Sequence, residues 1–71
     1  MQGYSLEFVE SINTSPHSDV KRLAMRAIQL RVSVIEIAAY LGVTRIAVYS
    51  WFSGKRRPSA THFQQLEKYL G

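Results

Sequence analysis

The chain has 71 residues, of which 46% are hydrophobic and 20% charged, and its net charge is +4. This composition excludes a disordered chain, and the absence of cysteine excludes disulfide frameworks, thiolate catalysis and zinc held by cysteine. No apolar run approaches the ~20 residues of a membrane span, and no basic-then-apolar N-terminus suggests a signal peptide. We therefore expect one soluble, cytoplasmic domain over residues 1–71, since two domains of ordinary size would not fit.

The net positive charge belongs entirely to the second part of the chain. Residues 1–43 carry equal numbers of acidic and basic side chains, so the whole net charge of +4 belongs to residues 44–71. The cations of that part are Arg45, Lys55, Arg56, Arg57 and Lys68. Such an asymmetry indicates a polyanionic partner. A solubilising surface is the alternative interpretation.

The N-terminal segment, residues 1–14, fits two patterns. Leu6, Val9 and Ile12 have the three-residue spacing of a short helix, whereas Tyr4, Leu6 and Phe8 alternate as in a strand. We favour the helix.

A longer helix is predicted from about Val20 to near Arg31. Its start has two candidate capping pairs, Ser15-Pro16 and Ser18-Asp19. Its predicted buried stripe consists of Val20, Leu23, Ala24, Ala27, Ile28 and Leu30.

Two short helices are predicted next, with a glycine between them. Ser33 and Glu36 form a capping-box pattern at the start of the first, and Gly42 can take the positive φ that ends it. Thr44 is a suitable N-cap for the second, which should run from Arg45 to about Phe52. The first helix should bury Ile37, Ala38 and Leu41.

A last helix is predicted after the basic loop. Gly54 closes the preceding helix, and Pro58 prevents the loop from continuing it. Ser59 can cap the last helix, whose predicted buried side carries Phe63, Leu66, Tyr69 and Leu70.

The two short helices and their turn match a helix-turn-helix unit. Ala38 falls where the helices cross, Gly42 makes the turn, and Val43 folds back over it. Val48 and Trp51, three residues apart, anchor the second of the two helices to the core.

Over roughly residues 20–70 the chain resembles the Cro and phage-repressor type of helix-turn-helix family. The matching string is Glu36-Ile37-Ala38, Leu41-Gly42-Val43-Thr44, Val48, Trp51 and Gly54-Lys55-Arg56-Arg57-Pro58. The resemblance implies an all-α, lambda-repressor-like bundle of four to five helices that binds DNA as a transcriptional repressor. Val34 stands where many members carry glutamine, and Phe52 stands where an acidic residue often follows the tryptophan.

The resemblance also implies which helix enters the major groove of DNA, namely the one over residues 45–52. The stripe of this helix opposite its buried residues consists of Arg45, Ile46, Tyr49 and Ser50, with Ser53 at its end. Arginine can bond guanine O6 and N7, serine suits several base edges, and isoleucine can contact a thymine methyl group. The alternative for Ile46 is packing on Tyr49 or on the N-terminal segment.

Other residues are candidates for contact with DNA phosphates. Lys55, Arg56 and Arg57 directly follow the predicted recognition helix, where the DNA backbone would pass. The remaining candidates are Ser33 and Thr44, at the starts of the two short helices, and Ser53.

The sequence predicts no enzyme, no cofactor, no metal site and no small-molecule substrate. His17 and His62 are isolated, and the acidic residues include no pair placed for acid–base catalysis. The expected partner is a double-stranded DNA operator bound by a homodimer, in a bacterial or phage-infected cell. The candidate dimer surfaces are the N-terminal segment and the last helix around Tyr69 and Leu70.

Two alternatives remain open at this stage. One is a protein-interaction module, such as an antitoxin with secondary DNA binding. The other is a DNA-binding fragment of a longer regulator.

Overall fold

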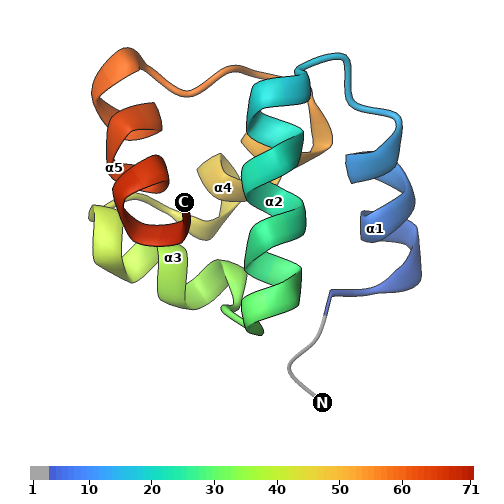
Figure 1. Ribbon diagram of the computed structural model, residues 1–71, viewed down its shortest axis with the longest axis horizontal. Helices are drawn as coiled ribbons and strands as arrows, with labels where there is room; N and C mark the ends of the chain where they lie inside the picture. The colour runs from blue at the N-terminus through green and yellow to red at the C-terminus, as the bar shows by residue number, and fades with distance from the viewer. Residues whose placement is uncertain (1–3) are drawn as a thin grey trace.

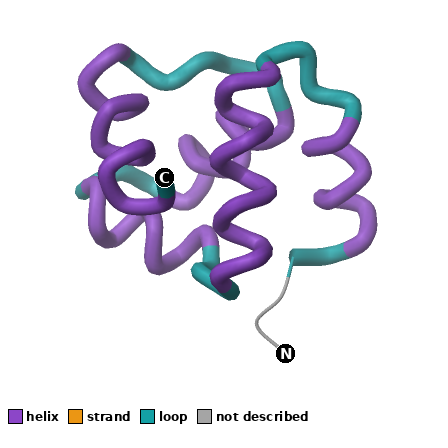
Figure 2. The backbone as a smooth tube through the Cα atoms, in the orientation of Figure 1, coloured by secondary structure: helices purple, strands orange, loops and turns teal. Residues whose placement is uncertain are grey.

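The computed structural model describes residues 4–71, and every regular element in that part of the chain is a helix (Figures 1 and 2). The helices are α1 (Leu6–Asn13), α2 (Ser18–Leu30), α3 (Val34–Leu41), α4 (Arg45–Ser53) and α5 (Ala60–Leu70). Helix α2 runs through the middle of the molecule, with α1 on one side and α5 on the other, and α4 behind it (Figure 1). The prediction of an all-α bundle is confirmed.

Four of the helices begin at a serine or threonine whose side-chain oxygen accepts a backbone N–H three residues later. These capping residues are Ser5, Ser33, Thr44 and Ser59. At α3 the predicted capping box is complete, because the Glu36 carboxylate also accepts the Ser33 N–H at 2.9 Å. Each bond satisfies an amide that the helix itself leaves without a partner, which is why these sequences start helices where they do.

Helix α2 begins differently from the prediction. Its N-cap is His17, and no side-chain bond caps the helix there. The Ser15 hydroxyl accepts the His17 N–H at 3.2 Å and so closes the preceding loop, while Ser18 is already the first helical residue. The Asp19 carboxylate accepts the Val20 N–H at 2.8 Å and satisfies one amide of the first turn.

The end of α2 corrects the predicted buried stripe. Leu30 is 45% exposed, because Arg31 adopts a left-handed conformation with φ of 60° and turns the chain back. The Val32 N–H then bonds the Ala27 carbonyl at 2.9 Å, a Schellman-type closure. Val32, rather than Leu30, therefore packs against the core.

The N-terminal segment is helical as predicted, but its buried residues differ from those expected. Leu6 is 75% exposed, whereas Ile12 is fully buried and Phe8 packs against the core. Phe8 and Ile12, four residues apart, lie on the face of α1 that contacts α2 and α4. Burial raises the pKa of Tyr4, whose hydroxyl stays protonated and donates to the Val32 carbonyl at 2.8 Å.

The core draws residues from every helix. Its fully buried large side chains are Ile12, Val20, Leu23, Ile37, Val48, Phe52 and Leu66. In α5, Leu66 and Leu70 are buried as predicted, while Phe63 and Tyr69 are only partly covered.

Helices α3 and α4 have helix-turn-helix geometry. They are bent by 115° at the break over residues 42–44, within the range typical of such units. Gly42 takes a φ of 73° and Ala38 is buried where the helices meet, as predicted. The Val43 N–H folds back to the Ala38 carbonyl at 3.0 Å.

No single helix within residues 4–71 is long and apolar enough to cross a membrane. Helices α3 and α4 reach the necessary length and composition only as a bent pair.

Candidate nucleic-acid interface

Helix α4 is fixed from behind by three buried side chains. Val48, Trp51 and Phe52 are all in the core. Phe52 stands where the resembling family often has an acidic residue, and here it adds a fully buried aromatic ring to the helix anchor. The orientation predicted for α4 is therefore confirmed, since Val48 and Trp51 face inward.

The opposite stripe of α4 faces solvent. Arg45, Ile46 and Tyr49 are exposed and Ser50 is half-buried. Ile46 is 70% exposed, so neither Tyr49 nor the described part of the N-terminal segment, residues 4–14, covers it. A large apolar side chain held this openly suits contact with another apolar group such as a thymine methyl.

The side chain of Tyr49 is positioned by α1. Its ring meets Phe8 edge-on, with centroids 4.9 Å apart and planes at 72°, and Phe8 in turn stacks on Tyr4 at 5.6 Å. Sequence analysis missed this contact, because nothing in the local pattern relates Phe8 to a helix forty residues later.

The starts of α3 and α4 differ in charge. At α3, the Glu36 carboxylate already occupies the Ser33 amide, and its charge opposes an approaching anion. At α4 the first turn has no acidic residue, Arg45 is its first residue, and the Thr44 hydroxyl accepts the Ala47 N–H at 3.2 Å. The Thr44 hydroxyl donates to no acceptor within residues 4–71, and the charge at the start of α4 is more favourable to an anion than the charge at the start of α3.

The loop after α4 is tied to the helix end. The N–H groups of Lys55 and Arg56 donate to the Ser50 carbonyl at 3.0 and 3.3 Å, and Gly54 takes a φ of 86°. Pro58 is buried at the far end of the loop. The exposed side chains of Lys55 and Arg56 therefore start from a backbone held in place.

Arg57 has a partner that sequence analysis did not find. Its guanidinium donates two hydrogen bonds to the Asp19 carboxylate, at 2.8 and 3.1 Å. These bonds hold the pKa of Asp19 at about 2, below its usual range, and they raise the pKa of Arg57. The pair links the basic loop to the start of α2, and no spacing signal could reveal it across 38 positions.

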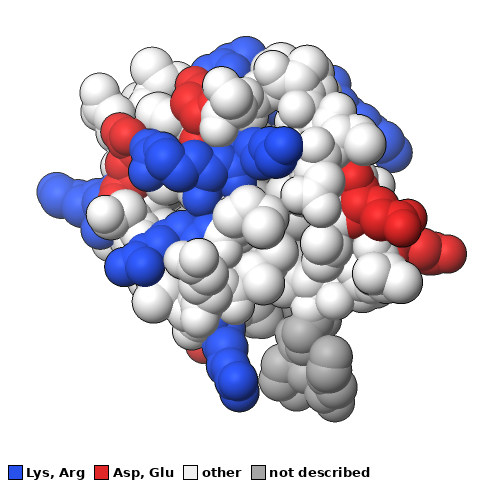
Figure 3. Space-filling view, turned by 45° about the vertical axis from the view of Figure 1, so that its right-hand side comes forward, with Lys and Arg blue, Asp and Glu red and all other residues white. Residues whose placement is uncertain are grey.

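Most cations of the predicted interface pair with no carboxylate in the part of the chain that the structure describes. Two ion pairs form within residues 4–71, Arg22 with Glu67 and Arg57 with Asp19. On the face shown in Figure 3, cationic side chains gather at the left and centre, and the largest group of carboxylates lies apart at the right. The cations of the interface that no described carboxylate pairs are Arg45, Lys55 and Arg56.

The two histidines, His17 and His62, lie far apart in the sequence and make separate contacts. Within the described residues, no group of three histidine, aspartate or glutamate side chains could hold a metal ion. His62 lies 3.2 Å from the Ser59 hydroxyl and rests near the Trp51 ring, at 5.3 Å between centroids.

Comparison with known proteins identifies the part of the chain that carries this geometry. The model of a protein family described as helix-turn-helix matches residues 23–71, which include α3, α4, the basic loop and α5. No curated protein and no solved structure matches the chain. Helix α1 and the first turn of α2 lie outside the matched residues.

Proposed function

Because the chain belongs to the Cro and phage-repressor type of helix-turn-helix family, a family of DNA-binding regulators, we propose that it is a small Cro-like repressor recognising a specific operator. Repression would follow from occupying the operator and excluding polymerase. The observation that carries the proposal is α4, which is anchored by three core residues and presents a mostly exposed stripe beside cations that no carboxylate within residues 4–71 pairs.

We assign base reading to the outward stripe of α4. The residues concerned are Arg45, Ile46, Tyr49 and Ser50. Arg45 combines exposure with the absence of a described carboxylate partner, so its guanidinium is available for a bidentate contact with guanine. Tyr49 is held by Phe8 and would enter the groove with little loss of side-chain freedom.

We assign phosphate contact to groups at both ends of α4. Thr44 lies at its start, and Ser53, Lys55 and Arg56 lie at its end. Ser33 and Arg57 are weaker candidates. The Ser33 amide is occupied by Glu36, and Arg57 would have to share its guanidinium with Asp19.

The proposed functional unit is a homodimer on a pseudo-palindromic operator. Helix α4 has 9 residues and spans about 13 Å, which reads only a few base pairs. Half-sites ~34 Å apart would place two such helices in successive major grooves. Of the two candidate dimer surfaces we favour α5, because Tyr69 stacks at 4.2 Å on Tyr40, which is 55% exposed, so that two aromatic rings lie together at the surface.

The test is selection of duplexes from a random double-stranded pool by the purified protein, followed by affinity measurement. The expected result is an enriched pseudo-palindrome with half-sites about one helical turn apart, bound at least ~10³-fold more tightly than unrelated duplex. Failure to enrich any sequence, with equal and weak binding to all duplexes, would contradict the proposal. That result would favour the alternative function, a protein-interaction module.

A further inference from the structure

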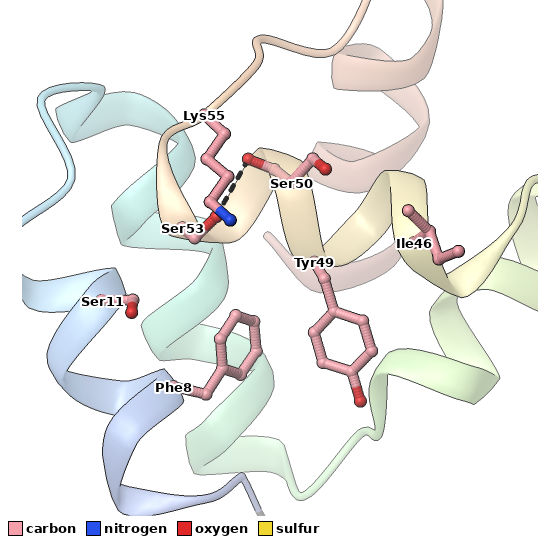
Figure 4. A pocket seen from close by; sticks show the side chains of 7 residues that line it. All are labelled: Phe8, Ser11, Ile46, Tyr49, Ser50, Ser53 and Lys55. Carbon is pink, nitrogen blue, oxygen red and sulfur yellow. Dashed lines mark hydrogen bonds between the residues drawn. The ribbon is translucent and has the colours of Figure 1, made fainter.

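A shallow groove of about 280 Å³ runs between α1 and α4, beside the proposed base-reading stripe (Figure 4). Helix α1 contributes Phe8 and Ser11 to its lining, and α4 contributes Ile46 and Tyr49. The α1 side of this groove lies outside the residues that match the family, whereas its α4 side lies within them.

One end of the groove is polar and cationic. Ser11 faces Ser53 and Lys55 across it (Figure 4). Lys55 is exposed and has no carboxylate partner within residues 4–71. The two hydroxyls make only long bonds to carbonyls of their own helices, Ser11 to Glu7 at 3.2 Å and Ser53 to Ser50 at 3.4 Å. Both hydroxyls can rotate toward a charged acceptor, which forms stronger hydrogen bonds than a carbonyl does.

The other part of the groove is apolar. The rings of Phe8 and Tyr49 lie side by side, and Ile46 lies farther along α4 (Figure 4). This arrangement matches one nucleotide unit of a DNA strand. The cation and the two hydroxyls suit its anionic phosphate, and the two aromatic rings suit the apolar C–H groups of its deoxyribose.

The groove is continuous with the proposed DNA-reading surface. Ile46, Tyr49 and Ser53 are spaced at three and four residues and so lie along one stripe of α4. A strand whose bases meet this stripe would pass its backbone along the stripe's edge, where the groove lies. The exposed carboxylates of Glu7 and Glu10 on α1 are not part of the lining, although Glu7 lies one turn before Ser11 on the same face of α1 and its charge opposes a phosphate there.

We propose that α1 forms part of the DNA interface, with one strand's phosphate bound by Ser11, Ser53 and Lys55 and the adjoining deoxyribose resting on Phe8 and Tyr49. The inference depends on the proposed DNA-binding function. It extends the contact surface beyond the helix-turn-helix unit to a helix that the family match does not include.

The test compares two charge insertions on α1. Ser11→Glu places a carboxylate in the groove, and Asn13→Glu places the same charge on an exposed position about 200° around the helix. Ser11→Glu should weaken binding to the selected operator by about tenfold or more, because like charges brought together at an interface are strongly unfavourable. Asn13→Glu should weaken it less than about threefold. Both variants should melt near the wild-type temperature, since both positions are at the surface.

A second readout uses the absence of cysteine from the chain. Ser11→Cys and Asn13→Cys can each be labelled at a single thiol with an iron–EDTA reagent that cuts nearby DNA. The Ser11→Cys conjugate should cut the operator at the edge of each half-site, with several-fold less cutting from the Asn13→Cys conjugate. Inorganic phosphate at matched ionic strength should leave the amide NMR signals of Ser11 and Lys55 in place, whereas the duplex should shift them.

The outcomes separate the inference from the function on which it depends. If wild-type protein binds the operator but the two glutamate variants lose affinity equally, or the two conjugates cut equally, α1 is not in the interface and only this inference is overturned. If inorganic phosphate shifts the signals as much as the duplex does, the groove is a free-phosphate site and the inference is again wrong. If wild-type protein binds no duplex, both the proposed DNA-binding function and the inference about α1 are wrong.

Discussion

Helices α3 and α4 are joined to each other by short-range contacts, whereas α1 is joined to the rest of the fold by long-range ones. The helix-turn-helix unit closes on itself through the caps at Ser33 and Thr44 and the Val43–Ala38 bond. Helix α1 is held by Tyr4, which donates to Val32, and by Phe8, which packs on Tyr49. The comparison indicates that local sequence shapes the turn between α3 and α4, whereas the position of α1 depends on contacts with the rest of the fold. Helix α1 in turn orients Tyr49, one of the proposed base-reading residues.

The largest expected effect tests whether α1 is part of the same cooperative unit. Ile12 is fully buried, so Ile12→Ala should destabilise the protein by about 2–5 kcal/mol and lower the melting temperature in a single transition. Leu6→Ala, on the same helix but at an exposed position, should stay within about 0.5 kcal/mol of wild type. Melting followed by circular dichroism measures both. An unchanged main transition in Ile12→Ala would show that α1 folds apart from the bundle.

Two glycines with positive φ, Gly42 and Gly54, allow a local contact to be compared with a long-range one. Gly42 and Gly54 both have positive φ, so alanine at either costs about 1 kcal/mol in backbone strain. A side chain at Gly42 would meet nothing within 4 Å, whereas at Gly54 its Cβ would lie 2.6 Å from the Ser15 hydroxyl and 2.8 Å from Pro16. Gly54→Ala should therefore destabilise the protein more than Gly42→Ala, measured by urea unfolding. Equal losses would mean that the segment before α2 does not pack on the end of α4.

The smallest expected effect on stability concerns the pair that joins α2 to the basic loop. The pKa of Asp19 is lowered from 3.8 to about 2, so the contribution of the pair is present above pH 3.8 and is lost as the pH falls toward 2. Because both side chains are nearly half exposed, the change is small. The melting temperature of wild type should fall slightly more than that of Asp19→Asn between pH 5 and pH 2. Parallel curves would show that the pair adds nothing to stability.

The sequence was sufficient to predict those features of the structure whose physical cause acts within a few residues. Serine and threonine caps, the glycine at position 42 and the spacing of Val48 and Trp51 each act within a few residues, so the helix-turn-helix unit and its outward stripe could be predicted. The exposure of Leu30 could not be predicted, because it results from a left-handed turn at a non-glycine residue, Arg31.

The parts of the candidate site that sequence analysis missed depend on tertiary contact. Arg57 meets Asp19 across 38 positions, and Phe8 meets Tyr49 across a similar distance. Neither pair has a spacing or a composition that marks it. The roles of the outward residues of α4 remain proposals, because they depend on DNA rather than on the fold.

The measurement that tests the central claim most directly is affinity across a salt series for the selected operator and a scrambled duplex, made on Arg45→Ala and Lys55→Ala. Arg45→Ala should lose about 1–3 kcal/mol on the operator and less on the scrambled duplex, because it reads a base. Lys55→Ala should weaken both duplexes alike and reduce the salt slope by about one, because it binds a phosphate. Equal loss on both duplexes for Arg45→Ala would contradict base reading by Arg45. No loss on either duplex for both variants would contradict DNA binding through α4 and its basic loop.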